Sequence, residues 1–334
     1  MTQCNEILND VPNQELENYN LEPGNTNKKK KKGIDSQKKS RAIFYYALIA
    51  IPLVQFAIFY IGVNINSILL SFQSYIRDEN GMYVTAFVWF KNFGEMLNEL
   101  LYTAKFIHTF KNTAIMFVLN LVVIGLSLIF SYYIYKKLPL HGFFRVVLFL
   151  PQMVSSIALV LLYKYFVVDC LPAIFKVVGI TLPDIFDGST NELGAIFVYN
   201  VWAGFGTQII IYSSTMSGIS ESMVEAAKID GITPLKEFFY ITIPSVFGVL
   251  TIYVVATVAG MFVHQMNLYN FRGGANDSYF SSVGYYLYAS MVNPETTLMD
   301  YPRLSAFGLI LTFITLPLAF GVKKLMEKYG PSEN

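Results

Sequence analysis

Six long apolar segments dominate this chain, and each is long enough for a helix to cross a lipid bilayer. A hydrocarbon core about 30 Å thick needs roughly 20 apolar helical residues. Hydrophobic residues make up 54% of the chain and charged residues only 14%, which excludes an ordinary soluble surface. We therefore predict an all-α integral membrane protein with six transmembrane helices. The segments are approximately 43–72, 113–135, 143–167, 194–219, 244–269 and 305–322.

The distribution of basic residues predicts how these helices are oriented. With the N-terminus in the cytoplasm, sixteen of the 24 Lys and Arg residues fall on the cytoplasmic side. They lie within 28–41, 136–145, 228–236 and 323–328. Cytoplasmic loops of membrane proteins carry such an excess of positive charge. Both termini are therefore expected in the cytoplasm.

Residues 1–41 form a polar, Lys-rich block that is expected to be a disordered cytoplasmic tail ahead of a membrane domain at 42–330. The run from Lys28 to Lys32 is typical of an anchor that touches anionic lipid headgroups, and a nucleic-acid patch is the alternative. We favour the anchor, and no nucleic acid is expected as a partner. Cys4 and Cys170 show no metal-ligand spacing, so no metal site is expected.

The centres of all six segments lack Asp, Glu, Lys and Arg. Carriers driven by protons or sodium commonly place ionisable groups there, so ion coupling is not indicated. The chain also lacks the Gly-rich loop ending in Gly-Lys-Ser/Thr that cradles nucleotide phosphates. We expect neither enzyme activity nor a bound cofactor in this chain. If it moves a solute uphill, the energy must enter from another subunit.

Residues 220–243, on the expected cytoplasmic side, are predicted to form two short helices joined by a turn. Ser222 and Glu225 match a capping box at the start of the first helix. Gly231 can take the left-handed conformation that ends a helix, and Thr233-Pro234 fits an N-cap followed by proline. Ala226 and Ala227 would leave a smooth side that seats in a groove of another protein, with Glu225 at its rim. An ordinary interfacial amphipathic loop is the alternative.

This stretch resembles the EAA motif of ABC importer permeases. Glu225-Ala226-Ala227 is followed after three residues by Gly231 and after nine more by Ile241-Thr242-Ile243-Pro244, with Ile243 where Leu is commoner. Further similarities are Asn112-Thr113, the run from Gly142 to Arg145 and the run from Tyr285 to Tyr288. From about residue 42 to 330 the chain is similar to carbohydrate permeases of the maltose type, in particular to the first permease subunit.

The resemblance implies the type I ABC importer transmembrane fold in a bacterial cytoplasmic membrane. It further implies a second homologous permease, two ATP-binding subunits that hold ATP and Mg, an extracellular solute-binding protein and a sugar substrate. The residues implied in coupling to the ATPase are Glu225, Ala226, Ala227, Asp230 and Gly231.

The resemblance also implies a sugar path beside the EAA segment. Distances along the chain from Glu225 that match those in the maltose-type permease fall on Asn200, Ala203 and Gly204, and on Gly260, Met261 and His264. Gln208 joins Asn200 and Gly204 at helical spacing, which puts all three on one helix face. Polar groups on such a face are expected to look into the bundle. The alternative is that these residues only pack neighbouring helices.

Other functions remain as alternatives. A permease for an amino acid, a peptide or phosphate carries a related motif, although Asp230-Gly231 and Phe238 favour sugar. An intramembrane enzyme is disfavoured because no His/Asp/Glu cluster stands at the membrane face. A scaffold that recruits a cytosolic ATPase is a third.

Overall fold

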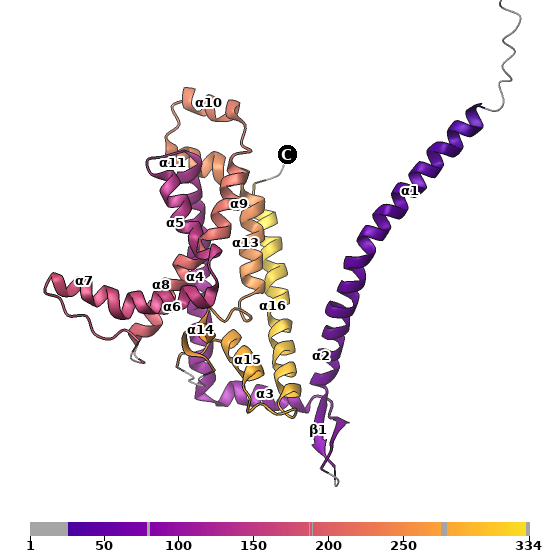
Figure 1. Cartoon of the computed structure of the whole chain (residues 1–334), viewed down its shortest axis with the longest axis vertical. Helices are drawn as coiled ribbons and strands as arrows, with labels where there is room; N and C mark the ends of the chain where they lie inside the picture. Colours follow the sequence, from indigo (N-terminus) through magenta and orange to yellow (C-terminus); the bar gives the residue numbers. More distant parts are fainter. Residues whose placement is uncertain (1–25, 79–80, 187, 189, 275–278, 332–334) are drawn as a thin grey trace, which may run out of the picture. The chain divides into compact units, whose positions relative to one another are not determined.

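The computed structural model describes residues 26–78, 81–186, 188, 190–274 and 279–331 (Figure 1). Contacts divide the chain into an N-terminal unit that ends at Asn66 and a larger unit that begins at Ser67. The N-terminal unit consists of α1 (Thr26–Gln55), the π-helical turn η2 (Phe56–Gly62) and the start of α2 (Val63–Ser71).

Helix α1 begins inside the predicted tail. Residues 26–41 are helical and continue into the first apolar segment, so the expectation of a disordered tail up to residue 41 is not met from Thr26 onward. Lysine has a favourable helix propensity, and a lysine run that precedes an apolar helix can extend it. Residues 1–25 of the predicted tail lie outside the described residues.

The larger unit contains a β-hairpin and a helical bundle. Strands β1 (Gln73–Arg77) and β2 (Tyr83–Phe87) are antiparallel, with Gln73 opposite Phe87. The helices of this unit are α3 (Lys91–Tyr102), α4 (Ala104–Tyr135), α5 (His141–Met153), α6 (Ser156–Tyr165), η3 (Phe166–Cys170), α7 (Leu171–Val177), α8 (Thr190–Gly204), α9 (Gly206–Met216), α10 (Glu221–Ile229), α11 (Pro234–Glu237), η4 (Phe238–Thr242), α12 (Ile243–Ser245), α13 (Phe247–Ala259), α14 (Leu268–Arg272), α15 (Val283–Val292) and α16 (Tyr301–Tyr329).

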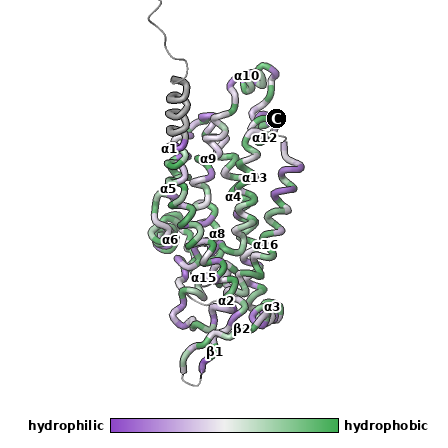
Figure 2. Tube along the Cα trace, turned by 90° about the vertical axis from the view of Figure 1, so that its right-hand side faces the viewer, coloured by the Kyte–Doolittle hydropathy of each residue, from purple (hydrophilic) through white to green (hydrophobic). Residues whose placement is uncertain are grey.

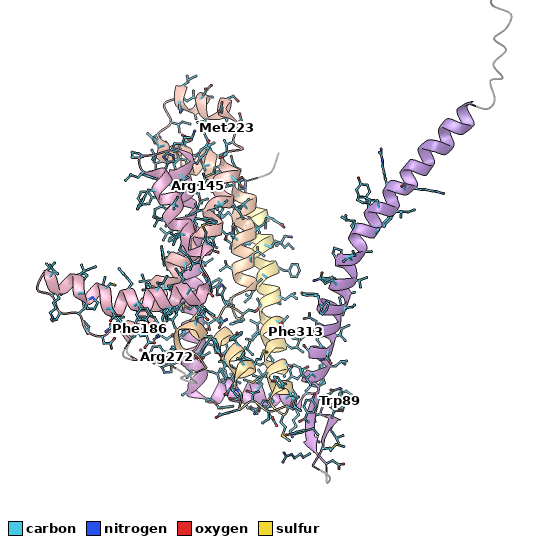
Figure 3. The ribbon with its side chains drawn as sticks, in the orientation of Figure 1. Trp89, Arg145, Phe186, Met223, Arg272 and Phe313 are labelled. Atoms are coloured by element: carbon cyan, nitrogen blue, oxygen red, sulfur yellow. The ribbon has the colours of Figure 1, made fainter. Side chains whose placement is uncertain are left out.

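Helix α4 packs against α8, α9 and α13 in this bundle. Helix α5 packs on α9, and α13 runs along α16. The buried side chains between these helices are large and apolar, among them Ile196, Ile209, Met216 and Phe307. On the outside of α16, Phe313 is exposed and points away from the bundle, as expected of a lipid-facing residue (Figure 3).

The predicted helical membrane architecture is confirmed, and the β-hairpin of β1 and β2 is an addition that the all-α prediction did not include. Five helices in the described part of the chain are long and apolar enough to span a membrane, and a sixth is added if one bent pair counts as a single span. The five are Lys39–Ser71, Phe106–Tyr135, Ser156–Val177, Asn191–Met216 and Tyr301–Tyr329. The bent pair is Pro234–Ser245 with Phe247–Ala259, which meet at 72°.

The segments predicted for 143–167 and 244–269 are not continuous helices. The segment predicted for 143–167 is interrupted between α5 and α6, because Val154 and Ser155 adopt extended backbone conformations. The direction of the chain changes there, and α6 and α7 leave the bundle sideways (Figure 1). The segment predicted for 244–269 ends as a helix at Ala259, and the backbone from Gly260 to Asn267 is not helical.

Ion pairs between distant segments mark the two ends of the bundle. At one end Lys136, just after α4, forms an ion pair with Glu237 on α11. At the other end Arg303 on α16 binds Glu99 on α3 at 2.7 Å. Figure 1 shows α10 and α11 at the first end and α3 and α15 at the second. The stretches between the two ends are mostly apolar, while polar residues gather toward the ends (Figure 2).

Candidate functional site

A cavity of about 470 Å³, open to the surface of the bundle, is lined from α4, α5, α6, α8, α9, α13 and the chain after α13. Six of the seven residues predicted for the sugar path line it, namely Asn200, Ala203, Gly204, Gln208, Gly260 and His264. The spacing along α8 and α9 thus places these residues together. Their contact with a sugar stays a prediction.

Met261 lies elsewhere. Its side chain packs against an apolar cluster that includes Phe106, Phe262 and Phe307. The prediction took Met261 from its distance along the chain from Glu225, and that distance does not fix which way a side chain points in the non-helical backbone after Ala259. Met261 is therefore in the protein core near the cavity and does not line it.

Gly204 has a packing role as well as a place in the cavity wall. A Cβ atom built on Gly204 would lie 3.0 Å from Cγ1 of Val123 on α4. The missing side chain lets α8 approach α4 closely, which is the packing interpretation considered for this glycine. Both interpretations apply, because the same residue lines the cavity.

Asn200 is held by several hydrogen bonds. Its Nδ2 donates to the backbone oxygens of Ile196 at 2.8 Å and Met266 at 3.0 Å, and its Oδ1 accepts from Nδ2 of Asn267 at 3.3 Å. Met266 and Asn267 have φ angles of 51° and 57°. Left-handed backbone is tolerated by Asn but unfavourable for Met, so Asn200 stabilises a strained segment of the cavity wall.

The wall contains polar residues that sequence reasoning missed. Asn120 comes from α4, Gln152 from α5, Tyr253 from α13, and Asn267 from the segment after α13. Gln152 donates from Nε2 to the backbone oxygen of Ala203 at 2.9 Å, close to the break between α8 and α9. Amide side chains within the apolar segments could have indicated these residues, because lipid offers no hydrogen-bond partners and such side chains therefore face the interior of the protein.

No Asp, Glu, Lys or Arg lines the cavity in the described part of the chain. The buried ion pair between Arg272 and Glu192, at 2.7 Å, belongs to α14 and α8 outside this lining. Arg272 also lies over the ring of Phe280 at 3.9 Å, and Figure 3 shows it below α6, on the same side as Phe186. The cavity therefore offers amides and hydroxyls but no fixed charge, an arrangement that suits a neutral ligand with many hydrogen-bonding groups.

The predicted helix-turn-helix is present as α10 and α11, with one correction at its start. The N-cap of α10 is Ser220, whose Oγ accepts a hydrogen bond from the backbone N–H of Met223 at 3.4 Å. Ser222 was predicted for this position, but it lies inside the first turn and its hydroxyl contacts that of Ser220 at 2.6 Å. The two serines are only two residues apart, so spacing alone did not separate them.

The end of α10 follows the prediction. Gly231 has a φ angle of 71°, in the left-handed region. The backbone N–H of Ile232 donates to the oxygen of Ala227 at 2.9 Å and that of Gly231 to Lys228 at 3.1 Å, which is a Schellman motif. Pro234 begins α11 after Thr233, although the Thr233 side chain forms no capping hydrogen bond.

The residues predicted to contact an ATPase divide between two faces of the loop. Glu225, Ala226, Asp230 and Gly231 are exposed. Ala227 is only 5% exposed and faces the protein itself, at helical spacing from buried Val224. The prediction that Ala226 and Ala227 share a free smooth side is therefore wrong for Ala227.

The second half of the loop is joined to α4. The Tyr132 hydroxyl donates to the backbone oxygen of Pro234 at 2.9 Å, and the rings of Tyr132 and Phe238 are 4.9 Å apart. Together with the ion pair between Lys136 and Glu237, these contacts fix α11 to the end of α4. Met223 on α10 and Arg145 on α5 lie toward this same end of the bundle (Figure 3).

Comparisons with known proteins identify similar transporters, although no family model matches the chain. It is 28% identical over 191 residues to the probable ABC transporter permease protein YurN of Bacillus subtilis (strain 168), covering 55% of this chain and 64% of YurN. A probable ABC transporter permease protein of Mycoplasma genitalium, MG188, is 30% identical over 37% of this chain and 38% of its own length. These matches span less than two thirds of each relative.

A longer match is to the arabinooligosaccharides transport system permease protein AraP of Halalkalibacterium halodurans, 22% identical over 82% of this chain and 85% of AraP. Among solved structures, a bacterial ABC transporter involved in the import of the acidic polysaccharide alginate has a similar chain. The TM-score is 0.68 at 15% identity, covering 88% of this chain and 98% of that chain. The chain therefore has the fold of ABC importer permeases, and several of its curated homologues are permeases of sugar ABC transporters.

Proposed function

We propose that this chain is a permease subunit of an ATP-driven importer of sugars or oligosaccharides. It forms half of the translocation path and couples to a separate ATPase. Relatives named for starch degradation products, arabinooligosaccharides and lactose support the carbohydrate class. The absence of cationic residues from the described cavity lining disfavours a phosphate permease, the rival among charged solutes.

One observation carries the proposal: the helices that line the cavity lead directly into the exposed loop. Helix α9 carries Gln208 in the cavity wall and ends at Met216, only four residues before the N-cap Ser220 of α10. On the other side, α11, η4 and α12 lead into α13, which carries Tyr253 at the cavity and is followed directly by Gly260. A displacement of α10 would therefore move both walls of the cavity, which is what alternating access requires.

The proposal includes partners. A second homologous permease completes the path. Two ATP-binding subunits bind ATP and Mg, and α10 is the contact of this chain with them. An extracellular solute-binding protein delivers the sugar. A solved complex of the alginate transporter with a pentasaccharide-bound periplasmic protein supports the last of these. The chain itself binds no cofactor. It lies in the bacterial cytoplasmic membrane among lipids, with both termini in the cytoplasm.

The test is uptake by vesicles that contain the complete complex. ATP-dependent accumulation of radiolabelled maltotriose, arabinotriose or lactose is expected with the wild-type chain and is lost when this subunit is omitted. Uptake that continues without the chain, or ATP-driven uptake only of amino acids, peptides or phosphate, would contradict the proposal. Omission of the chain also separates a transporter from a scaffold, since a scaffold leaves uptake intact in its absence.

A further inference from the structure

Helix α4 is far along the chain from the loop of α10 and α11, but side chains attach it to both ends of α11. The Tyr132 hydroxyl donates to the backbone oxygen of Pro234, the first residue of α11, at 2.9 Å. Glu237, the last residue of α11, forms an ion pair with Lys136. The ring of Phe238, the next residue, is 4.9 Å from that of Tyr132. Helix α11 is therefore fixed along its whole length to the end of α4.

The ion pair is enclosed by protein. Both of its side chains are largely buried. The Lys136 ammonium also lies over the rings of Tyr132 and Tyr135, 5.7 and 5.6 Å from their centres. An aromatic ring attracts a cation above its face, and a partly buried pair is screened by salt much less than an exposed one. The charge of Lys136 is thus held between Glu237 and two aromatic rings, which makes this contact the most polar attachment of the loop to α4.

Helix α4 leads from this contact to the cavity without a break. It is one helix of 32 residues, Ala104–Tyr135, and contains no proline. Its residues Asn120 and Val123 line the cavity. At 1.5 Å per residue, Val123 lies about 20 Å from Lys136 along the helix axis. Sharp kinks in helices arise at proline and similar interruptions, so α4 is expected to move as one body.

The two routes from the loop to the cavity along the chain both contain a break. Helix α9 ends at Met216, and a turn at 217–219 separates it from α10. On the other side, the helical segments Pro234–Ser245 and Phe247–Ala259 meet at 72°. A few residues at such a junction can absorb a large change of backbone angles. The contact of α11 with α4 is therefore the route on which a displacement of the loop is least absorbed.

We propose that the ion pair between Lys136 and Glu237 transmits displacement of the α10–α11 loop to α4, and through α4 to the cavity wall. Lys136 and Glu237 are then positioning residues for the coupling of ATP hydrolysis to uptake. Neither residue lines the cavity, so both act through α4. This inference rests on the proposed function and deepens it, because it names the pair of residues through which the loop acts on the central helix of the bundle.

The variants must separate coupling from stability. The double variant Lys136→Met/Glu237→Gln removes both charges at once and leaves neither charge buried without a partner. Replacement of both members of a buried ion pair by groups of similar volume is often neutral in stability. Tyr132→Phe removes only the hydrogen bond to Pro234 and keeps the ring. Lys137→Met is the matched control, because Lys137 is the next lysine along the chain, is exposed and forms no ion pair in the described part of the structure.

The experiment measures sugar accumulated per ATP hydrolysed in vesicles that contain the complete complex, with whichever of maltotriose, arabinotriose and lactose the wild-type complex accumulates. The double variant is expected to lower this ratio about three- to tenfold and Tyr132→Phe about twofold, the factors that correspond to loss of one strong and one weak polar contact. Lys137→Met should keep the wild-type ratio. Thermal unfolding of each complex should stay close to that of wild type.

A pair that only stabilises the fold would behave differently. It would change the amount of assembled complex, so uptake and ATP hydrolysis would fall in proportion and their ratio would not change. A wild-type ratio in the double variant therefore overturns the inference, as does an equal loss in Lys137→Met. If the double variant does not assemble, Tyr132→Phe decides, and a wild-type ratio there overturns the inference.

These outcomes are distinct from failure of the proposed function. ATP-driven accumulation of a sugar by the wild-type complex would still support that function when the ratio is unchanged in every variant. If the wild-type complex accumulates none of the three sugars, the proposed function fails and the inference fails with it.

Discussion

The side-chain amide of Asn200 donates a hydrogen bond to the backbone oxygen of Met266 at 3.0 Å and so joins α8 to the strained segment after α13. This geometry determines what Asn200→Ala is expected to do. The substitution should lower the thermal unfolding temperature of the complex and its uptake together, because a buried carbonyl left without a partner costs about 1–3 kcal/mol. Asn98→Ala, at an exposed position on α3, is the control. Reduced uptake with unchanged unfolding would instead favour direct contact of Asn200 with the sugar.

Gly231 should be sensitive to backbone conformation and not to side-chain size. No atom lies within 4 Å of a Cβ built there, yet φ is 71°. We expect Gly231→Val to abolish uptake and sugar-stimulated ATP hydrolysis while the complex still reaches the membrane, because left-handed backbone costs an L-residue about 1–2 kcal/mol or more. Gly231→Asn should retain more activity, since Asn tolerates this region. Gly308→Ala, in open space on α16, should behave as wild type.

The ion pair between Lys136 and Glu237 should contribute more than exposed pairs do. Its side chains are 19% and 6% exposed, against 53% and 60% for Lys323 and Glu327. Glu237→Ala is expected to destabilise the complex by the order of 3 kcal/mol, because Lys136 loses its partner in a buried setting. Glu327→Ala should cost less than about 1 kcal/mol. Thermal unfolding compares the two, and equal effects would refute a special role for the pair.

The orientation of the bundle can be measured by cysteine labelling in a variant without Cys4 and Cys170. Ile229 on α10 is 86% exposed and Leu298, before α16, is 47% exposed. A membrane-impermeant maleimide should label Leu298→Cys on intact cells that have no outer membrane, and Ile229→Cys only after permeabilisation. The opposite pattern would reverse the topology deduced from the basic residues.

The apolar segments predicted the helical membrane architecture because a helix that crosses the bilayer must be apolar over about 20 residues, and each segment shows this by itself. The breaks were not predicted. Val154 and Ser155 interrupt the third segment beside Pro151, Gln152 and Ser156, and α13 ends at Ala259 although apolar residues continue. Backbone conformations at such points depend on the neighbouring helices, which composition does not describe.

Only part of the cavity lining was predicted, and the rest was missed for a similar reason. Asn200, Gly204 and Gln208 share a helix face, so their spacing put them together. Tyr253 lies on a different helix, and its place in the same wall depends on how α13 packs against α4 and α16. One polar residue in an apolar helix indicates a buried face but not which neighbour it meets.

Because no atom lies near a Cβ built on Gly231, a methyl group there meets no steric barrier, and only the left-handed backbone conformation of the turn after α10 opposes it. The mirror image of alanine has its own preferred backbone region at positive φ, where L-alanine is strained. A D-alanine introduced at position 231 by chemical ligation should therefore preserve transport, whereas L-alanine impairs it. Two variants with the same atoms and the same mass would then differ in function only through the handedness of one carbon.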